Sequence, residues 1–395
     1  MKNKERKLAK GIDTPYRARA FTEKVYGGPA ENPREVWKEM LDVPKNFYPG
    51  PNKYHVYYGE LHGHTRLSDG RPTPDEYFQN IRYVAKLDFA ALTDHDHGGV
   101  GKAELWGEKW ELTKQKVAEY NEPHKFTTIL AYERDSYPWY NNLVIYYNHY
   151  DGEMIREEID GELSMNKLSE LLKREDIILV PHDTYHLDSG TDFNQIPPAL
   201  YPPMLEIYSR GDSAEYFDNP YNIMDIQCEG GYWQDALKRG AKMGCIAASD
   251  DHSCKNGLID SESYGDDIRK YPGITGVLAE SNTLPDIFNA LKARRTFAFM
   301  GGRMEIDFRI NGHYMGEEFE EEEERGIYLK VSADAEIKRI TIVKNCRDYV
   351  FMTRTEQFLY DNRIETDCDF YYLRVETVDG RCGWTSPIWI HRKNV

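Results

Sequence analysis

Seven short apolar runs alternate with helix-like segments between about residues 55 and 300, and this alternation limits the possible folds more than any other feature. The runs are Val56–Leu61, Phe89–Thr93, Thr128–Tyr132, Ile177–Val180, Met204–Tyr208, Cys245–Ala248 and Ile274–Leu278. Helical patterns lie between them at 74–86, 103–120, 165–173, 232–238 and 284–293. Because strands that alternate with helices favour a parallel α/β sheet, seven such strands predict a barrel or near-barrel.

The first of these helices has an explicit start signal. Thr73 stands at the N-cap position, Pro74 follows it, and Glu76 lies three residues after the cap. Threonine and glutamate at this spacing form a capping box, and proline fits the first helical position because its missing N–H is not needed there. We therefore expect a helix to begin at Pro74.

The pattern changes on both sides of this region. Residues 1–54 are basic at the start, then rich in proline and glycine, with one short helical stretch at Glu35–Leu41, and we interpret them as an N-terminal arm. After about residue 301 only short strands and turns remain, at 304–310, 326–331, 337–344, 370–377 and 387–391. We therefore expect three parts: an arm at 1–54, a barrel at 55–300 and an antiparallel β-sandwich at 301–395.

The composition argues against nucleic-acid and membrane partners. Lys and Arg number 50 against 67 Asp and Glu, a net charge of −17, whereas phosphate backbones require a concentrated basic surface. No apolar run reaches the roughly 18 residues of a membrane span, and the charged N-terminus lacks the apolar stretch of a secretory signal. The six cysteines form no CxxC pair and are typical of reduced thiols. We expect a cytoplasmic protein whose partner is a small-molecule substrate; its oligomeric state is left open.

Histidine or carboxylate side chains follow five of the seven runs. They are His62-Gly63-His64, Asp94-His95-Asp96-His97, Glu133, His182-Asp183 and Asp250-Asp251-His252, and Glu206 lies within a further run. In a parallel barrel these ends face one side, where such folds assemble active sites. Because alternate residues of an extended strand point the same way, His62 with His64 and Asp250 with His252 can each bind one metal ion.

These residue types indicate a centre of several divalent ions. Neutral imidazoles supply nitrogen ligands that suit Zn, Mn or Fe, and carboxylates add charge and can bridge two ions. Seven of the twelve histidines lie in these clusters, namely His62, His64, His95, His97, His182, His186 and His252. The potential ligands exceed the four or so that one tetrahedral zinc ion needs, so the sequence predicts two or three divalent ions.

Taken in order, the motifs resemble those of the PHP (polymerase and histidinol phosphatase) superfamily of metallohydrolases. Glu60–Thr65 with Ser68–Gly70 is similar to the first motif, Thr93–His95 to the second and Glu133 to the third, while Pro181-His182 and Ser249–His252 are similar to the later ones. The likeness covers about residues 55–300. In addition, 293–298, 311–312 and 384–389 resemble a subgroup with an appended β-domain, some of whose relatives are carbamate or ester hydrolases.

The resemblance implies both a fold and a ligand set. The fold is α/β, a distorted seven-stranded β/α barrel with a two- or three-metal centre, here followed by a small C-terminal antiparallel β-sandwich. The implied ligands are His62, His64, Asp69, His95, Glu133, His182, Asp250 and His252, with Glu133 as the bridge. The family often has a further histidine after the glutamate, where this chain reads Pro138–Asn142. Either His149 serves there or the third ion is weak or absent, and the roles of His97 and His186 stay open.

This residue set predicts a hydrolase in which metal ions hold and deprotonate a water that attacks an ester centre. We take Glu133 and Asp250 as the catalytic residues. Candidates for orienting the ligating imidazoles are Asp94, Asp96 and Asp251. The sequence contains no GxGxxG loop, P-loop or GxSxG elbow, which argues against dinucleotide, nucleoside triphosphate and serine-hydrolase sites in their usual forms.

The substrate class is less sharply indicated. Arg66, Arg134 and Arg210 lie near proposed ligands and are candidate substrate-binding residues, which favours a phosphoesterase on a small-molecule phosphoester. The aromatic-rich segment Tyr132–Tyr147 favours a carbamate or carboxylic ester, although its aromatic side chains also suit plain packing. A third hypothesis is a non-catalytic carbohydrate- or protein-binding module with a decayed site.

Overall fold

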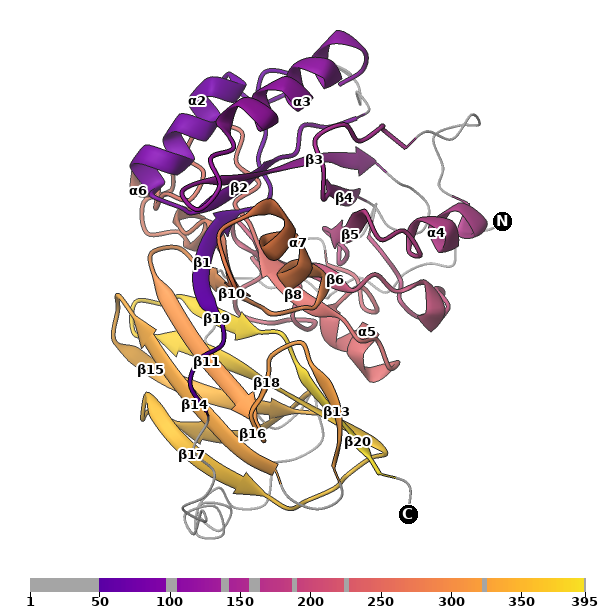
Figure 1. Cartoon of the computed structure of the whole chain (residues 1–395). Helices are drawn as coiled ribbons and strands as arrows, with labels where there is room; N and C mark the ends of the chain where they lie inside the picture. Colours follow the sequence, from indigo (N-terminus) through magenta and orange to yellow (C-terminus); the bar gives the residue numbers. More distant parts are fainter. Residues whose placement is uncertain are drawn as a thin grey trace.

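The computed structural model describes residues 50–96, 105–135, 142–155, 164–186, 190–223, 227–321 and 325–393. The expected N-terminal arm therefore lies outside the described residues except for 50–54. His97 and residues 136–141 of the aromatic-rich segment lie outside them as well. The fold is mixed α/β with more strand than helix (Figure 1).

All seven strands predicted before residue 300 are present. They are β1 (His55–Glu60), β2 (Phe89–Leu92), β3 (Thr127–Asp135), β5 (Ile177–His182), β6 (Met204–Ser209), β8 (Gly244–Ala247) and β9 (Gly273–Ala279). Three strands that start before residue 300 were not expected: β4 (Asn142–Tyr147), which lies between β3 and β5, the two-residue β7 (Asp212–Ser213) and β10 (Thr296–Met300). Both faces of β4 are buried, so its sequence shows no alternation of polar and apolar residues that would identify a strand.

Strand pairing is mixed rather than uniformly parallel. β1, β2 and β3 pair in parallel, as do β6 and β8, whereas β9 is antiparallel to β1 and β4 is antiparallel to both β3 and β5. Only the six residues 136–141 separate β3 from β4. Because a parallel crossover needs about a dozen residues or more, so short a connection permits only an antiparallel neighbour. The short strand β7 (Asp212–Ser213) pairs with the end of β6.

The strands surround one apolar cluster. Alternate side chains of β2, β3, β4 and β5 point into it, and β6, β8, β9 and the helix α7 (Leu284–Lys292) complete it. The sheet of β6, β7 and β8 is separate, but β6 packs beside β5 and β8 packs beside β9. Thr275 on β9 links the two sheets, because its hydroxyl accepts from Ala247 N and donates to Ala247 O.

All five helices predicted between residues 55 and 300 are present on the outside of these strands, and the one predicted at Glu35–Leu41 lies outside the described residues. The five are α2 (Pro74–Gln79), α3 (Glu108–Tyr120), α4 (Met165–Leu171), α5 (Trp233–Lys238) and α7, and α2 continues as a π-helix over Asn80–Ala85. Short helical turns lie at α6 (Ser261–Tyr264), Pro198–Leu200 and Ile268–Lys270. No helix among the described residues combines the length and apolarity that crossing a membrane requires.

The capping box at the start of α2 is confirmed. The hydroxyl of Thr73 accepts from Glu76 N at 3.1 Å, and the Glu76 carboxylate accepts from Thr73 N at 2.7 Å. Both bonds satisfy N–H groups that the first helical turn leaves without intrahelical partners. Pro74 occupies the first helical position, as expected.

The C-terminal region consists of strands. They are β10 (Thr296–Met300), β11 (Met304–Ile310), β12 (His313–Tyr314), β13 (Glu318–Glu321), β14 (Arg325–Ala333), β15 (Ile337–Lys344), β16 (Arg347–Met352), β17 (Glu356–Asp361), β18 (Cys368–Thr377), β19 (Cys382–Thr385) and β20 (Ile388–Arg392). β12, β11, β14 and β17 form one sheet. Asn311 and Gly312 both have positive φ between β11 and β12, as the predicted turn requires.

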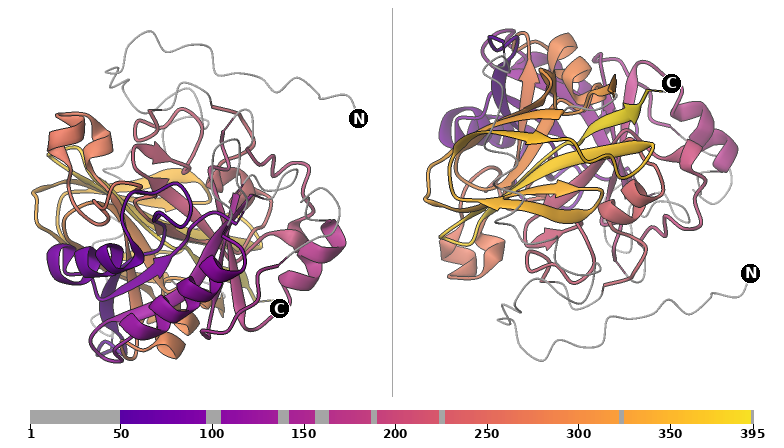
Figure 2. Two further views of the ribbon diagram at one scale, coloured as in Figure 1. Left: turned by 90° about the horizontal axis from the view of Figure 1, so that it is seen from above. Right: turned by 90° about the horizontal axis from the view of Figure 1, so that it is seen from below.

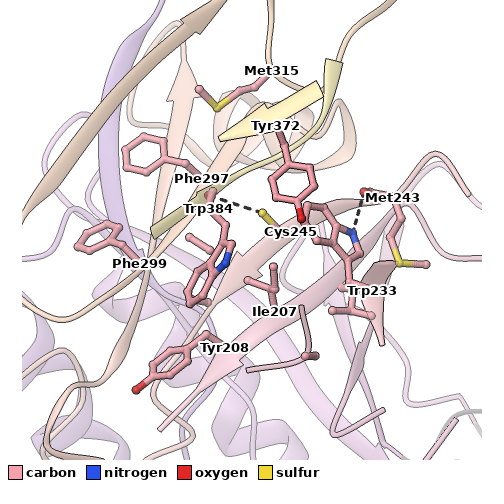
Figure 3. Close-up of a cluster of buried hydrophobic side chains, with 14 of the residues drawn as sticks. Ile207, Tyr208, Trp233, Met243, Cys245, Phe297, Phe299, Met315, Tyr372 and Trp384 are labelled. Atoms are coloured by element: carbon pink, nitrogen blue, oxygen red, sulfur yellow. Dashed lines mark hydrogen bonds between the residues drawn. The ribbon is translucent and has the colours of Figure 1, made fainter. Parts of the chain in front are cut away.

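The remaining C-terminal strands belong to the same sheet as the N-terminal ones. β19 pairs with β10, and β10 pairs with β9, so the hydrogen-bonded sheet crosses residue 300 without a break. Viewed from below, the C-terminal strands lie as a layer against the rest of the chain (Figure 2). Trp384 and Tyr372 pack with Tyr208 and Trp233 in a shared core (Figure 3).

Candidate metal centre

All eight predicted ligands lie close together at one end of the strands. His62 and His64 follow β1, Asp69 lies in the next turn, His95 follows β2 and Glu133 is on β3, while His182 ends β5 and Asp250 and His252 follow β8. Isolated parallel bridges join His95 to Glu133 and Gly63 to Asp251. These bridges extend the sheet beyond the regular strands and align the ligand-bearing segments.

One group of four donors contains three buried side chains, those of His62, His64 and Glu133, and the partly exposed Asp250. Glu133 Oε2 lies 3.3 Å from His62 Nε2 and 3.4 Å from His64 Nε2, and Asp250 Oδ1 lies 3.0 Å from His64 Nε2 and 3.6 Å from His62 Nε2. Ligands about 2.0–2.1 Å from a tetrahedral ion are separated by roughly 3.3 Å. These four spacings therefore match the coordination shell of a zinc-sized ion.

A second group surrounds Asp69 and is more exposed. Asp69 Oδ1 lies 3.2 Å from His252 Nε2, 3.6 Å from His95 Nε2 and 3.9 Å from His64 Nδ1. The side chains of Asp69 and His252 are 26% and 39% exposed, so this group forms the accessible side of the centre. A Cβ at Gly70 would lie 2.4 Å from His64 O, which explains why glycine follows Asp69 in the turn.

A third group includes His182. Its Nε2 lies 3.4 Å from Asp250 Oδ2 and 3.2 Å from Asp183 Oδ2, and its Nδ1 lies 3.4 Å from Glu206 Oε1. Asp250 therefore faces two sets of histidines, one with each oxygen.

The buried charges are held in the forms that metal binding needs. Burial raises the pKa of Glu133, but His95 and His62 outweigh it and hold that pKa well below its usual range. Burial would likewise raise the pKa of Asp250, and His62 and His182 lower it further than burial raises it. Both carboxylates are therefore ionised at neutral pH, as ligands must be.

The imidazoles differ from one another. Burial lowers the pKa of His64 to about 4, so this ring is neutral. Burial also disfavours the charged form of His62, but Glu206, Asp250 and Glu133 raise its pKa well above the usual value. A divalent cation among these carboxylates would take the place of that proton.

The residues fit divalent ions on their own geometry. His62 Nε2, His64 Nδ1 and Glu133 Oε2 are buried and make no hydrogen bond within the described part of the chain. Buried polar atoms without hydrogen bonds are costly. Here Glu133 Oε2 lies 3.3 Å from His62 Nε2, and His64 Nδ1 lies 3.9 Å from Asp69 Oδ1. The centre can therefore hold divalent ions on nitrogen and oxygen ligands.

Glu206 is a site residue that the sequence reasoning did not assign. It lies within β6, fully buried, with Oε2 2.9 Å from His62 Nδ1 and Oε1 3.4 Å from His182 Nδ1. It thereby turns the Nε2 atoms of both rings toward the centre. A carboxylate inside the otherwise apolar run Met204–Tyr208 was the available signal.

Two of the three acids proposed to orient imidazoles, Asp94 and Asp251, hold loops instead. Asp94 accepts hydrogen bonds from the backbone and hydroxyls of Thr65 and Ser68, which lead to Asp69. Asp251 accepts from the backbone N–H groups of Ser253 and Lys255. Asp96 lies 3.4 Å from an Arg134 nitrogen.

The candidate substrate-binding arginines are mostly engaged elsewhere. Arg134 is buried and donates to Ile155 O at 2.6 Å, on the side of β3 opposite to Glu133. Arg210 donates to the carbonyls of Arg269 and Lys255 and contacts Asp251, so it supports the loop after β8. Arg66 is 60% exposed and lies 3.8 Å from Glu76.

Two further histidines do not enter the ligand groups described above. His149 lies beyond the far end of β4, between Asp151 and Asp176, so it does not supply the further ligand considered for the third ion. His186 pairs with Gln227 through an isolated bridge. Tyr132, Tyr146 and Tyr147 of the aromatic-rich segment are buried packing residues.

The comparisons with known proteins show distant relatives. The family described as "Protein of unknown function (DUF3604)" matches residues 240–335. A Chlamydia pneumoniae protein is 24% identical over 364 residues and a Chlamydia trachomatis protein 26% over 378, each covering 85% of this chain, and both are described as uncharacterized. The chain spans 57% of the length of these relatives. A solved two-domain Bacteroides vulgatus protein described as containing a predicted PHP-like metal-dependent phosphoesterase is 15% identical, covers 86% of this chain and 97% of its own, and has a TM-score of 0.46.

Proposed function

We propose that this protein is a metal-dependent hydrolase of small-molecule phosphoesters. The observation that carries the proposal is the group of His62, His64, Glu133 and Asp250, in which one oxygen of each carboxylate lies 3.0–3.6 Å from a nitrogen of both imidazoles. Two carboxylates and two imidazoles form a donor set suited to Zn, Mn or Fe. The resemblance of the motifs to the PHP superfamily supports the same assignment, with two or three ions and a barrel over residues 55–300.

Bound divalent ions would supply Lewis acidity, which lowers the pKa of a water molecule and offsets negative charge on the ester oxygens. The residues of the chain divide the remaining work. Glu133 and Asp250 hold their negative charges close to the reacting centre, and Glu206 keeps two imidazoles in the orientation that binding requires. The partly exposed Asp69 and His252 mark the side from which a substrate can enter.

A carbamate or carboxylic ester is the second candidate substrate. The positions of two arginines favour this candidate over a phosphoester. Arg134 and Arg210 donate hydrogen bonds to backbone carbonyls and do not face the ligand groups, where they would have to lie to hold a phosphate. Arg66 is the exposed one of the three and remains the candidate for holding a phosphate. We propose a small molecule as the partner and the cytoplasm as the location in either case.

The experiment is a substrate panel on protein loaded with Mn²⁺ or Zn²⁺, after its metal content has been measured. The panel contains a phosphomonoester, a phosphodiester, a carboxylic ester and an aryl carbamate. Turnover of phosphoesters that disappears in Glu133→Gln, but not in the exposed control Glu153→Gln, supports the proposal. Turnover of the carbamate or carboxylic ester alone selects the second candidate. A metal content well under one ion per chain overturns both and favours a non-catalytic binding module.

A further inference from the structure

Asp250 is placed to serve two ions at once. Its Oδ1 lies with His62 and His64, and its Oδ2 lies 3.4 Å from Nε2 of His182. A carboxylate whose oxygens face separate histidines is suited to bridge two cations. The second of these positions, beside His182, needs further ligands.

Glu133 is poorly placed to supply one. Its Oε1 accepts a hydrogen bond from Asn142 Nδ2 at 2.6 Å, and its Oε2 lies with His62, His64 and His95. Asn142 stands opposite His182 in the β4–β5 ladder, so its amide lies between the glutamate and that histidine's strand.

Asp183 has the position that Glu133 lacks. Its Oδ2 lies 3.2 Å from His182 Nε2, close to the separation of two ligands of one ion, while its Oδ1 accepts from the Tyr185 hydroxyl at 3.4 Å. The backbone of Asp183 has a φ of 52°, a left-handed conformation that is uncommon outside glycine and that turns the residue out of the strand. Its side chain is 31% exposed, which leaves room for water in the remaining coordination positions.

We propose that Asp183, with His182 and Asp250, binds a separate divalent ion, and that Asp183 is the ligand that distinguishes this position. The inference rests on the proposed metal centre. It assigns the ion beside His182 to two aspartates and one histidine, with Glu133 reserved for the other ions.

The test is the metal stoichiometry of Asp183→Ala after saturation with Mn²⁺ and, separately, Zn²⁺ and removal of free ions. We expect one ion per chain fewer than in the wild type, with the remaining ions retained. Asp212→Asn is the matched control, and this variant should keep the full number of ions. The carboxyl group of Asp212 also belongs to the surroundings of His182 and Asp250, but it stands on β7. Circular dichroism verifies that both variants are folded.

The outcomes separate this inference from the proposed function. A wild-type protein that binds no ion removes the proposed function itself. A wild-type protein that binds two or more ions, with the same number in Asp183→Ala, overturns only the role of Asp183. Equal losses in Asp183→Ala and Asp212→Asn also overturn it, because the effect would then belong to the local charge and not to one ligand.

Discussion

Glu133 is the residue whose position relates most directly to the proposed metal chemistry. One of its oxygens lies within 3.4 Å of nitrogens from His62, His64 and His95, and the other is held by Asn142. Its charge is therefore concentrated at a single atom that faces three imidazoles. This arrangement makes the consequence of removing the charge predictable.

Glu133→Gln keeps the shape of the side chain but removes its charge. A neutral amide bridges cations poorly, so we predict the loss of at least one ion and a fall in kcat of roughly 100-fold or more. Metal analysis and steady-state kinetics check the prediction. Full metal content with near wild-type turnover would show that Glu133 is only a charge at a strand end.

Glu206→Gln tests the orientation of the imidazoles. The carboxylate offers one acceptor oxygen to Nδ1 of His62 and one to Nδ1 of His182, whereas glutamine has a single acceptor. One ring must then change its tautomer and carry the proton on Nε2, where it can no longer bind a metal. We predict metal affinity weaker by about 10- to 100-fold with the fold retained. Unchanged affinity, measured by competition with a chelator, would assign Glu206 a packing role.

Metal binding is expected to depend on pH. Neighbouring carboxylates raise the pKa values of His62 and His182 against the effect of burial, so both rings hold protons in the metal-free protein. Because a cation must displace these protons, affinity should rise with pH, and binding should release on the order of one to two protons. Calorimetry in buffers of different protonation enthalpy measures the release. Equal heats in all buffers would contradict the prediction.

Among the elements, the strands carry the ligands and the loops between them decide how the strands pair. The short connection at 136–141 makes β4 antiparallel and puts Asn142 opposite His182. The helices are specified more locally, as the capping box of α2 shows. A local signal of this kind can be tested by measuring the free energy of unfolding alone.

Thr73→Ala removes the cap of α2. The N–H of Glu76 loses its hydroxyl acceptor, and we predict a loss of about 1 kcal/mol in the free energy of unfolding, with metal content unchanged. Urea unfolding measures the difference. Thr73→Ser keeps the hydroxyl and should retain most of the stability, and equal losses in both variants would assign the effect to packing of the methyl group.

The chain as a unit is joined across residue 300 by the sheet and by a buried ionic cluster. Glu215, which lies between Tyr208 and Trp233 of the shared core in the sequence, accepts hydrogen bonds from Arg374, Tyr372 and Trp384, all of which are buried. Removing the partners of a buried charge typically costs about 3–5 kcal/mol. The division of the chain into domains at 55–300 and 301–395 stays a prediction. The contacts across residue 300 favour a single cooperative folding unit.

A chain that ends at Gly301 should therefore not fold cooperatively by itself. It would expose the edge of β10 that β19 covers and leave Glu215 without its three partners. We predict no sharp thermal transition for the shortened chain, and partial recovery when a 302–395 fragment is added. A cooperative transition near that of the full chain would instead establish residues 55–300 as an independent domain.

Much of the fold could be predicted because its signals are local. The seven apolar runs, the five helices and the turn at Asn311-Gly312 depend on residues close in sequence, and the structure contains each of them. The placement of His62 with His64 beside Glu133 followed from a strand end, whereas Asp250 and His252 do not act as the expected pair: Asp250 faces His62, His64 and His182, and His252 lies with Asp69. The backbone of Asp250 has a φ of 48°, so the alternation of an extended strand does not apply to it. β4 was missed because burial on both faces removes the alternation by which a strand is identified.

Which residues can bind metal was thus readable from the order of histidines and carboxylates along the chain, because the ends of neighbouring strands meet whatever the details of packing. Which atoms of those residues face each other could not be read from the sequence. The positions of Glu206 behind two imidazoles, of Asn142 on Glu133 and of Asp183 beside His182 depend on contacts between segments 9 to 144 residues apart, or on a single left-handed backbone angle. Such contacts arise only when the strands are packed together, and so do the burial and the charge pairing that set the pKa values of the centre.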